Sequence, residues 1–283
     1  MSDRLKVNQT SSLLTFLNSQ LKGWTRNKIK QRLKTGCVVV NGQPIMQHDH
    51  ELKAGDNVEV RASKKNMQHG TSRLEILYSD NDLIVINKPA GLLSVASADE
   101  NKQHALAILR MQLSRSKRSV RLWPVHRLDR DTSGVLMFAT SREMREAVNK
   151  GWSGADKTYL AVVEGHPNPS QGCIHEPLRM EPEKYQMIVG AHPEAKKAIT
   201  HFNTLRTVKD RALLEVQLET GRQHQIRAHM AWLGHSVIGD PRYGTDGPRM
   251  GLHALRLSIT RPKTGKRLTF EAPAPDAFLD LLR

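Results

Sequence analysis

The stretch Val125-His126-Arg127-Leu128-Asp129-Arg130-Asp131-Thr132-Ser133-Gly134 stands directly before the apolar run 135–139, which is predicted to be a strand. It contains more charged and polar side chains than a segment that only packs against a hydrophobic core would need. One interpretation is structural: Asp129 or Asp131 braces the loop against an arginine elsewhere in the chain. The other is that one of these carboxylates takes part in chemistry. From this stretch alone the structural interpretation is favoured.

A second polar stretch, Glu219-Thr220-Gly221-Arg222-Gln223-His224-Gln225-Ile226-Arg227-Ala228-His229-Met230, follows the alternating run 214–218. Its apolar side chains continue with helical spacing: Ile226, Met230 and Leu233. Arg227 then lies at the edge of the buried face of a helix, where its charge needs a partner. Arg227 and Arg222 are therefore the two arginines that could brace an aspartate of the first stretch.

Outward from these stretches, residues 73–283 contain short apolar or alternating runs separated by turns. The predicted strands are 82–87, 135–139, 159–163, 214–218, 255–259 and 268–270. Thr140 with Glu143 has the spacing of a capping box that opens a helix, and a last helix is predicted over 276–282. Adjacent strands joined by short turns indicate a mixed, largely antiparallel sheet. We therefore expect one α+β domain over 73–283, with helices flanking the sheet.

The N-terminal part of the chain differs, with two short predicted helices and a small hairpin sheet. The first helix is predicted over 12–21, and the second over 24–34 carries five basic residues and no acid. An apolar strand then runs into Asn41-Gly42, a strong signal for a tight hairpin turn. The polar, basic stretch 62–72 has no apolar periodicity and is predicted to be a linker. We therefore expect a small N-terminal domain over 12–61.

Charge narrows the class of partner. The chain of 283 residues carries 43 Lys and Arg against 28 Asp and Glu, a formal net charge of +15. Such an excess favours a polyanion, either nucleic acid or an anionic membrane surface. No basic amphipathic helix with an aromatic or Leu-rich face stands out, and no apolar run reaches the roughly 18 residues of a membrane span, so we expect nucleic acid and no membrane. Cys37 and Cys173 stand far apart, which fits a reducing cytoplasm.

Common catalytic motifs are absent from the sequence. It has no G-x-x-x-x-G-K-[ST], no G-x-G-x-x-G and no G-x-S-x-G. Its 13 histidines include no H-E-x-x-H, and the two cysteines stand alone. We therefore expect ordinary side chains to do any chemistry, without a cofactor or a metal.

The order of the N-terminal elements resembles the S-four-like RNA-binding domain, also called the α-L motif. The shared features are the basic helix, the turn at Gly36 and the hairpin at Asn41-Gly42. The family's usual opening Arg-Leu-Asp is replaced here by Ser12-Leu13-Leu14. The resemblance implies that the basic helix contacts the RNA backbone, which positions the RNA and confers little sequence choice. The residues implied in this contact are Arg26, Lys30 and Lys34.

The larger domain resembles the RluA-type pseudouridine synthases, the group that includes RluA, RluC and RluD. The stretch 126–134 resembles the family's loop His-Arg-Leu-Asp-x-x-Thr-Ser-Gly. Three further segments match in the family's order: 82–92, 157–161 and 221–244. An appended N-terminal domain is also frequent in this family. The resemblance implies the pseudouridine synthase fold and isomerisation of uridine to pseudouridine in structured RNA.

The resemblance also implies roles for individual residues. The reaction breaks the N-glycosidic bond, turns the uracil and joins ring carbon 5 to the same sugar carbon. Asp129 is implied as the catalytic carboxylate, acting as nucleophile or base, with Arg227 as its ion-pair partner. Tyr159 is implied to stack on the uracil and to help remove the proton from ring carbon 5. Ile226 would contact the other side of the ring, and Arg127 would fill the gap left by the flipped base.

Alternatives stay open at this point. Large-subunit ribosomal RNA is expected as substrate over transfer RNA, because family members with the extra N-terminal domain lean toward it. A non-catalytic RNA-binding or ribosome-assembly protein would explain the charge, but would not need Asp129, Tyr159 and Arg227 together. An N-glycoside hydrolase would cleave the same bond, yet glycosidases generally use two carboxylates, and only Asp129 has suitable neighbours. We expect a monomer.

Overall fold

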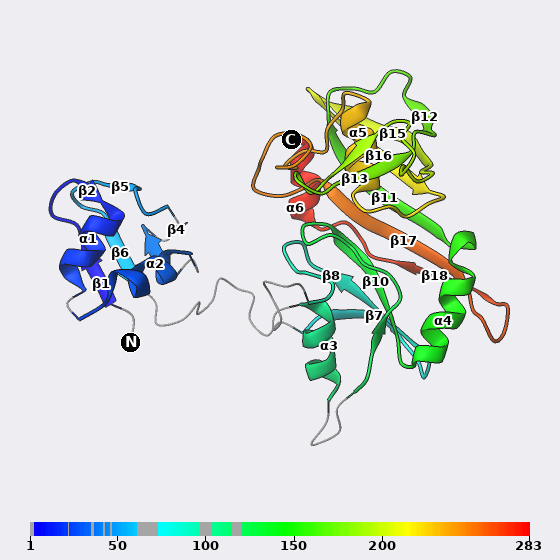
Figure 1. The fold of residues 1–283 in the computed structure, drawn as a ribbon, viewed down its shortest axis with the longest axis horizontal. Coiled ribbons are helices and arrows are strands. Elements are labelled where there is room, and N and C mark those ends of the chain that lie inside the picture. Colours follow the sequence, from blue (N-terminus) through cyan, green and yellow to red (C-terminus); the bar gives the residue numbers. More distant parts are fainter. Residues whose placement is uncertain are drawn as a thin grey trace. The chain divides into compact units, whose positions relative to one another are not determined.

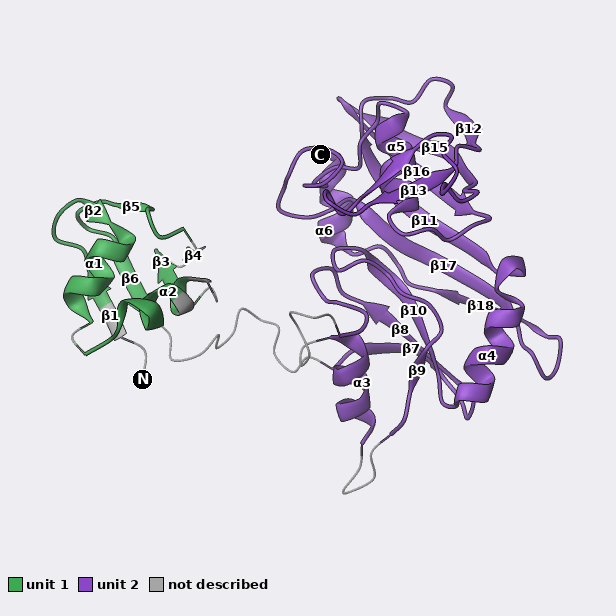
Figure 2. Cartoon of the chain, viewed as in Figure 1, with its two compact units in different colours: residues 1–72 green, residues 73–283 purple. Residues whose placement is uncertain are grey.

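The computed structural model describes residues 3–21, 23–34, 37–41, 43–45, 47–60, 73–96, 104–114 and 120–283. The chain divides into two compact units, Met1–Ser72 and Arg73–Arg283 (Figure 2), and each is described by itself. The predicted linker 62–72 lies outside the described residues.

The N-terminal unit combines two helices with two small sheets (Figure 1). Its helices are α1 (Leu13–Gln20) and α2 (Arg26–Lys34). Its strands are β1 (Asp3–Lys6), β2 (Ser11–Ser12), β3 (Val38–Val40), β4 (Gln43–Pro44), β5 (Glu51–Leu52) and β6 (Asn57–Val60). One sheet has the antiparallel order β1-β6-β3-β4, and β2 pairs with β5. Strand β1 lies before the range 12–61 expected for this domain, and it pairs along β6.

Capping residues and apolar spacing explain the two helices. Ser12 caps α1, because its hydroxyl accepts a hydrogen bond from the backbone N–H of Thr15 at 3.4 Å. The second helix begins at Arg26 rather than at Trp24, directly after Thr25, whose hydroxyl accepts a hydrogen bond from the N–H three residues later. The apolar faces of both helices and the strands share one core: Leu13, Leu17, Ile29, Leu33, Val38, Val40, Val58 and Val60.

The second unit is built on one ten-stranded sheet. Its strands are β7 (Glu75–Ser79), β8 (Leu83–Lys88), β9 (Trp123–Pro124), β10 (Ser133–Ala139), β11 (Asp156–Glu164), β12 (Gln171–Ile174), β15 (Thr200–Val208), β16 (Arg211–Leu218), β17 (Leu252–Thr260) and β18 (Arg267–Glu271). The order is β12-β15-β16-β11-β17-β10-β8-β7, with β18 paired to β17 and β9 to β10. Among these described strands only β10 and β17 run parallel. The predicted mixed, largely antiparallel α+β sheet is confirmed.

Helices cover both faces of this sheet (Figure 1). They are α3 (Ala105–Leu113), α4 (Arg142–Lys150), α5 (Gln225–Trp232) and α6 (Asp276–Leu279). Successive residues of a strand point to opposite faces. On β8, Ile84 shares a core with Leu109 of α3, whereas Val85 shares a core with Val148 of α4. Helices α3 and α4 therefore pack on opposite faces.

Strand β11 extends this arrangement to the other half of the sheet. Val163 shares a core with Met230 of α5, and Val162 shares a core with Phe278 of α6. Tyr159 packs against the cores beneath both α3 and α5, so these two helices lie on the same face of the sheet. A separate hairpin of β13 (Leu178–Glu181) and β14 (Gln186–Val189) lies beside α5. No helix in the described part of the chain is long and apolar enough to cross a membrane.

One helix start differs from the prediction. Ser141, not Thr140, caps α4, because the Ser141 hydroxyl accepts a hydrogen bond from the backbone N–H of Met144 at 3.0 Å. The Thr140 hydroxyl instead donates to the carbonyl of Asn81 at 2.6 Å. The capping box predicted at Thr140 is therefore wrong, since a tertiary contact engages that side chain.

Candidate active site

The loop 126–132 ends where β10 begins, beside the start of the parallel strand β17. Gly134 has a φ of +112°, and a Cβ there would lie 2.1 Å from the carbonyl oxygen of Ala254. Only glycine allows the two strands to approach this closely in that backbone conformation. Ala254 in turn pairs with Tyr159 on β11. The register therefore places Tyr159 close to the end of the loop.

Buried polar groups hold the loop in place. The Ser94 hydroxyl accepts a hydrogen bond from the N–H of Leu128 at 3.0 Å and donates to its carbonyl at 2.7 Å. The ammonium of Lys88, which is fully buried, donates to the carbonyl of Arg130 at 2.9 Å. Burial lowers the pKa of Lys88 to about 7, while the charges of the loop's two aspartates act to raise it. These contacts fix the backbone on both sides of Asp129.

Arg227 of α5 bridges two carboxylates. Its Nη1 donates to Oδ2 of Asp129 at 2.9 Å, which is the pair that the sequence predicts. Its Nε and Nη2 donate to the two oxygens of Asp240 at 2.6 and 2.8 Å. The Asp240 side chain is fully buried, whereas that of Asp129 is 30% exposed. The buried carboxylate therefore anchors the guanidinium, and the exposed one is presented to solvent.

The electrostatics of the pair formed by Arg227 and Asp240 favour the ionised form of both side chains. Burial acts to lower the pKa of Arg227, but the hydrogen bonds and charge of Asp240, and then the charge of Asp129, raise it above the usual range. Burial likewise acts to raise the pKa of Asp240, yet its hydrogen bonds with Arg227 hold that pKa below the usual value. The backbone N–H groups of Arg242 and Tyr243 also donate to Asp240 at 3.0 and 3.2 Å. Asp240 is thus a fully bonded anion.

The imidazole of His224 is the second nitrogen-bearing side chain beside Asp129. Its Nε2 lies 3.8 Å from Oδ2 of Asp129, and its Nδ1 lies 3.0 Å from the hydroxyl of Tyr243. Burial lowers the pKa of His224, against the charge of Asp129, which acts to raise it. The Tyr243 hydroxyl accepts a hydrogen bond from the N–H of Met187 at 2.7 Å, so its own proton is available to Nδ1. This assigns a neutral imidazole whose Nε2 proton is on the side of Asp129.

Tyr159 is half-buried between the cores beneath α3 and α5. Ile226, which is buried, belongs to the core beneath α5 against which Tyr159 packs. Burial, and after it the charge of Asp129, raises the pKa of Tyr159 well above its usual range. The phenol therefore carries its proton at neutral pH.

The remaining predicted residues are exposed or belong to the N-terminal unit. Arg127 is exposed on the loop, two residues before Asp129, and Asp131 is exposed in a turn. Arg26 and Lys30 are exposed on α2 of the N-terminal unit. The backbone of Lys34 belongs to α2, but its side chain lies outside the described residues.

Sequence reasoning missed three residues that complete the site. Asp240 stood in the segment 221–244 without a role, although an acid shortly after a buried arginine is a candidate partner for it. His224 and Lys88 likewise lie inside matching segments, 221–244 and 82–92, to which the sequence gives no individual roles at these positions. Within the described ranges, no group of three or more His, Cys, Asp or Glu side chains is placed to hold a metal ion.

Comparisons with known proteins place a chain of this fold, a mixed sheet flanked by helices, in the class of the pseudouridine synthases. The sequence profile of the RNA pseudouridylate synthase family matches residues 82–232. The uncharacterized RNA pseudouridine synthase YlyB of Bacillus subtilis is 34% identical over 282 residues, covering 94% of this chain and 91% of that protein. Ribosomal large subunit pseudouridine synthase D of Vibrio cholerae is 31% identical over 280 residues, covering 91% of this chain and 86% of that protein.

A solved structure agrees with these sequences. Human RNA pseudouridylate synthase domain containing 1 has a TM-score of 0.62 at 25% identity, covering 77% of this chain and 89% of that chain. The chain belongs to the RNA pseudouridylate synthase family. It is an RNA pseudouridine synthase, an enzyme that isomerises uridine to pseudouridine in RNA.

Proposed function

We propose that this enzyme modifies uridine in large-subunit ribosomal RNA. The observation that carries the proposal is the similarity to ribosomal large subunit pseudouridine synthase D of Vibrio cholerae. This similarity extends over 91% of this chain and therefore into both units. The net charge of +15 also suits a polyanionic substrate. Transfer RNA is the second candidate, and the experiment below separates the two.

Mapping pseudouridines in total RNA from cells with and without the gene tests this proposal. We expect the loss of one or more pseudouridines from large-subunit ribosomal RNA, because a uridine that this enzyme isomerises stays uridine when the enzyme is absent. A plasmid copy of the parent gene should restore them. A loss confined to transfer RNA would show that the proposed substrate is wrong.

The catalytic role in the isomerisation is assigned to Asp129, the more exposed of the two carboxylates that Arg227 binds. Oδ2 of Asp129 carries the bond from Arg227, which leaves Oδ1 to attack carbon or to accept a proton. Arg227 offsets the desolvation of Asp129 when RNA covers the site, since the same guanidinium is already held by Asp240. Asp129 thus acts as nucleophile or base, and Arg227 orients it.

Tyr159 and Ile226 are proposed to hold the uracil. The half-buried phenol supplies a flat apolar face near the end of the loop, and stacking on a base is sequence-tolerant. The raised pKa of Tyr159 means that the free enzyme holds a neutral phenol. To take the proton from ring carbon 5, the phenol must therefore pass its own proton to water in the same step, so that it is neutral again afterwards.

Arg127 is proposed to occupy the space that the flipped uridine leaves. Its side chain is exposed on the same loop as Asp129 and has no fixed place in the core. An extruded base leaves unstacked neighbours, which costs a few kcal/mol. A guanidinium plane can stack on those neighbours and offset part of that cost.

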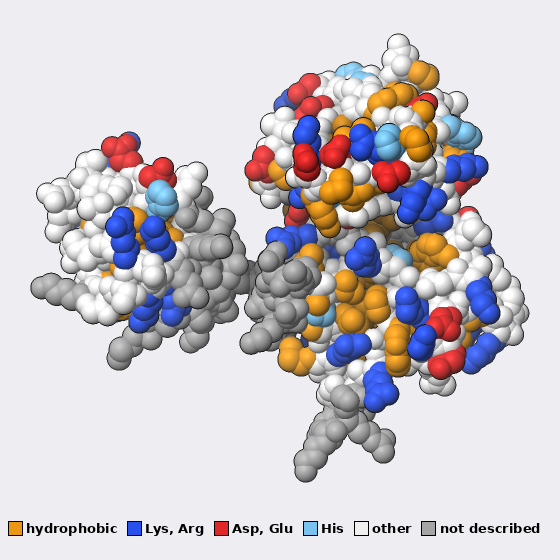
Figure 3. All heavy atoms as spheres, in the orientation of Figure 1, with side chains coloured by type: hydrophobic (Ala, Val, Ile, Leu, Met, Phe, Trp, Pro, Cys, Tyr) orange, Lys and Arg blue, Asp and Glu red, His pale blue; other side chains and the backbone are white. Residues whose placement is uncertain are grey.

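The N-terminal unit is proposed to be an S-four-like RNA-binding domain that binds phosphates through α2. Figure 3 shows Lys and Arg side chains gathered on the visible face of this unit. Arg26 and Lys30 are exposed one helical turn apart, and Lys34 continues the same row in sequence. On the opposite flank of α2, Lys28 lies 4.1 Å from the centroid of the Trp24 ring. The row at Arg26 and Lys30 is therefore the flank left open to RNA.

Replacing Arg26, Lys30 and Lys34 together with Gln should weaken RNA binding and flatten its salt dependence. Each lost phosphate contact lowers the slope of log affinity against log salt by about 0.9 on duplex RNA, because fewer counterions are released. Filter binding over a salt series measures both quantities. The control removes three exposed charges from the other unit with Lys150→Gln, Lys209→Gln and Lys266→Gln. If both variants changed the slope equally, α2 would be no more than a solvated face.

We further propose that the enzyme is a monomer that works in the cytoplasm. The two cysteines, Cys37 and Cys173, are free, which fits a reducing compartment.

A further inference from the structure

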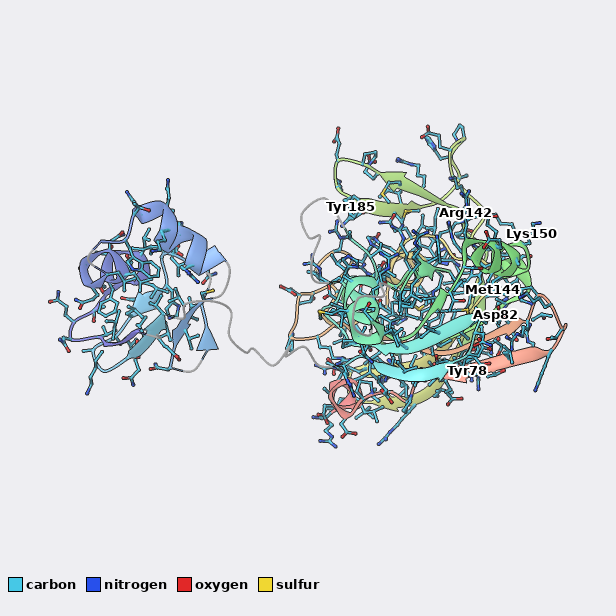
Figure 4. The ribbon with its side chains drawn as sticks, turned by 90° about the horizontal axis from the view of Figure 1, so that it is seen from below. Tyr78, Asp82, Arg142, Met144, Lys150 and Tyr185 are labelled. Carbon is cyan, nitrogen blue, oxygen red and sulfur yellow. The ribbon has the colours of Figure 1, made fainter. Side chains whose placement is uncertain are left out.

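Tyr185 is an exposed aromatic residue held in an unusual backbone conformation. It lies at the turn between β13 and β14, with 56% of its surface exposed. Its φ of +50° falls in the left-handed region, which bulky residues seldom adopt. Figure 4 labels Tyr185 on the opposite side of the catalytic unit from Tyr78 and Asp82 in that view. Such outliers persist only where surrounding contacts hold them, and they concentrate at functional sites.

Arg242 supplies those contacts. Its Nη1 donates to the carbonyls of Lys184 and Tyr185 at 3.2 and 2.8 Å. Its guanidinium carbon lies 5.1 Å from the centroid of the Tyr185 ring. The Gln186 side-chain amide donates back to the carbonyl of Arg242. The hairpin tip is therefore fixed to the loop that carries Asp240, and Arg242 covers one face of the Tyr185 ring.

A chain of rings connects this tip to the catalytic carboxylate. The rings of Tyr185 and His224 meet edge to face, with centroids 6.2 Å apart and planes at 77°. Nε2 of His224 lies 3.8 Å from Oδ2 of Asp129. Tyr185 is thus one ring removed from the carboxylate and still largely open to solvent. A residue that served only to pack the hairpin would not need to expose an aromatic ring here.

We infer that Tyr185, backed by Arg242, is a stacking platform for an unpaired nucleobase next to the target uridine in the RNA chain. The inference rests on the proposed function, in which Asp129 receives a flipped uridine. Extruding that nucleotide unstacks its neighbours, and an aromatic face binds any base because every base has a π-face. Arg242 adds a positive charge behind the ring, which strengthens stacking and suits the nearby phosphates.

The test compares Tyr185→Asn, which removes the ring but tolerates the left-handed backbone, with Tyr185→Phe, which keeps the ring. The probe is a synthetic stem-loop of large-subunit RNA that carries the mapped uridine. Binding is measured in the Asp129→Asn background, so that the chemical step does not enter. We expect Tyr185→Asn to weaken binding about 10-fold, within the range of one base–aromatic stack. Tyr185→Phe should bind with the affinity of the protein that retains Tyr185. Leu205→Ala, at an apolar side chain 50% exposed elsewhere on the sheet, should not weaken binding.

Abasic nucleotides placed one at a time beside the target identify the stacked base. One such position should weaken binding of the protein that retains Tyr185 about 10-fold. The same position should have no further effect on Tyr185→Asn, because the contact is already gone. Binding of Tyr185→Asn at parent affinity, or additive losses at every position, would overturn the platform. If binding depends on Tyr185 in this way but the parent enzyme leaves the stem-loop unmodified, only the proposed substrate is wrong.

Discussion

Asp129→Asn should reduce pseudouridine formation to below detection while RNA binding persists. The amide keeps the volume of the side chain, but it can neither attack carbon nor accept a proton under these conditions. Binding should survive because phosphate contacts dominate affinity for RNA, and an anionic side chain such as Asp129 makes no favourable contact with a phosphate. The release of tritium from RNA labelled at ring carbon 5 measures activity, and filter binding measures affinity. Arg227 remains held by Asp240 in this variant, so the loss of stability should stay near 1 kcal/mol.

Asp131→Asn is the matched control. It removes the same charge from the same loop, at a residue that is exposed and two positions away. It should retain most of the activity, because Asp131 makes no contact with Arg227 among the described residues. Activity of Asp129→Asn near the parent rate would show that the assignment of Asp129 is wrong. Equal losses in both variants would instead point to the net charge of the loop.

Local sequence patterns were enough to predict much of the fold and part of the candidate site. Strand β16 and helix α5 were predictable because their apolar side chains repeat with the period of each element. The charge of Arg227 at the edge of a buried face predicted a partner, and the family resemblance implied that this partner is Asp129. The hairpin of β13 and β14 was not predicted. Leu, Arg, Met and Glu alternate in β13 over only four residues, and Gln, Met, Ile and Val of β14 do not alternate, so neither strand gives a strong signal.

Tertiary contacts decided the rest. Thr140 and Ser141 are both good capping residues, and only the contact of Thr140 with Asn81 leaves the cap to Ser141. Asp240 follows Arg227 by 13 positions, and the loop that returns it to the guanidinium has no periodic signal. The exposed ring of Tyr185 likewise lies against the guanidinium of Arg242, which is distant in sequence, and the local sequence does not indicate this contact. Local sequence patterns do not record which distant residues meet.

Asp240→Asn should destabilise the catalytic unit and reduce activity strongly. The substitution leaves the buried guanidinium of Arg227 without its fully buried counter-charge, and breaking such a pair costs about 3–5 kcal/mol. For a domain of this size the melting temperature should fall by roughly 6–20 °C. The pKa of Asp240 in the folded protein lies below its unfolded value, so its stabilisation is present at neutral pH and is lost as pH falls through the folded pKa. The difference in stability between parent and variant should therefore shrink below about pH 4.

Two companion variants separate the buried pair from surface charge. Glu146→Gln breaks the surface ion pair of Glu146 with Arg142, in which the two side chains are 54% and 71% exposed. It should leave both stability and activity near the parent values.

Arg227→Lys keeps the positive charge but loses the planar fork, so one ammonium must replace three N–H donors that reach two carboxylates. Activity should fall strongly in Arg227→Lys even where circular dichroism shows a folded protein, because Asp129 loses its fixed orientation. If Asp240→Asn melted at the parent temperature and remained active, Asp129 alone would suffice to hold Arg227, and the bridge would not be the element that positions the carboxylate.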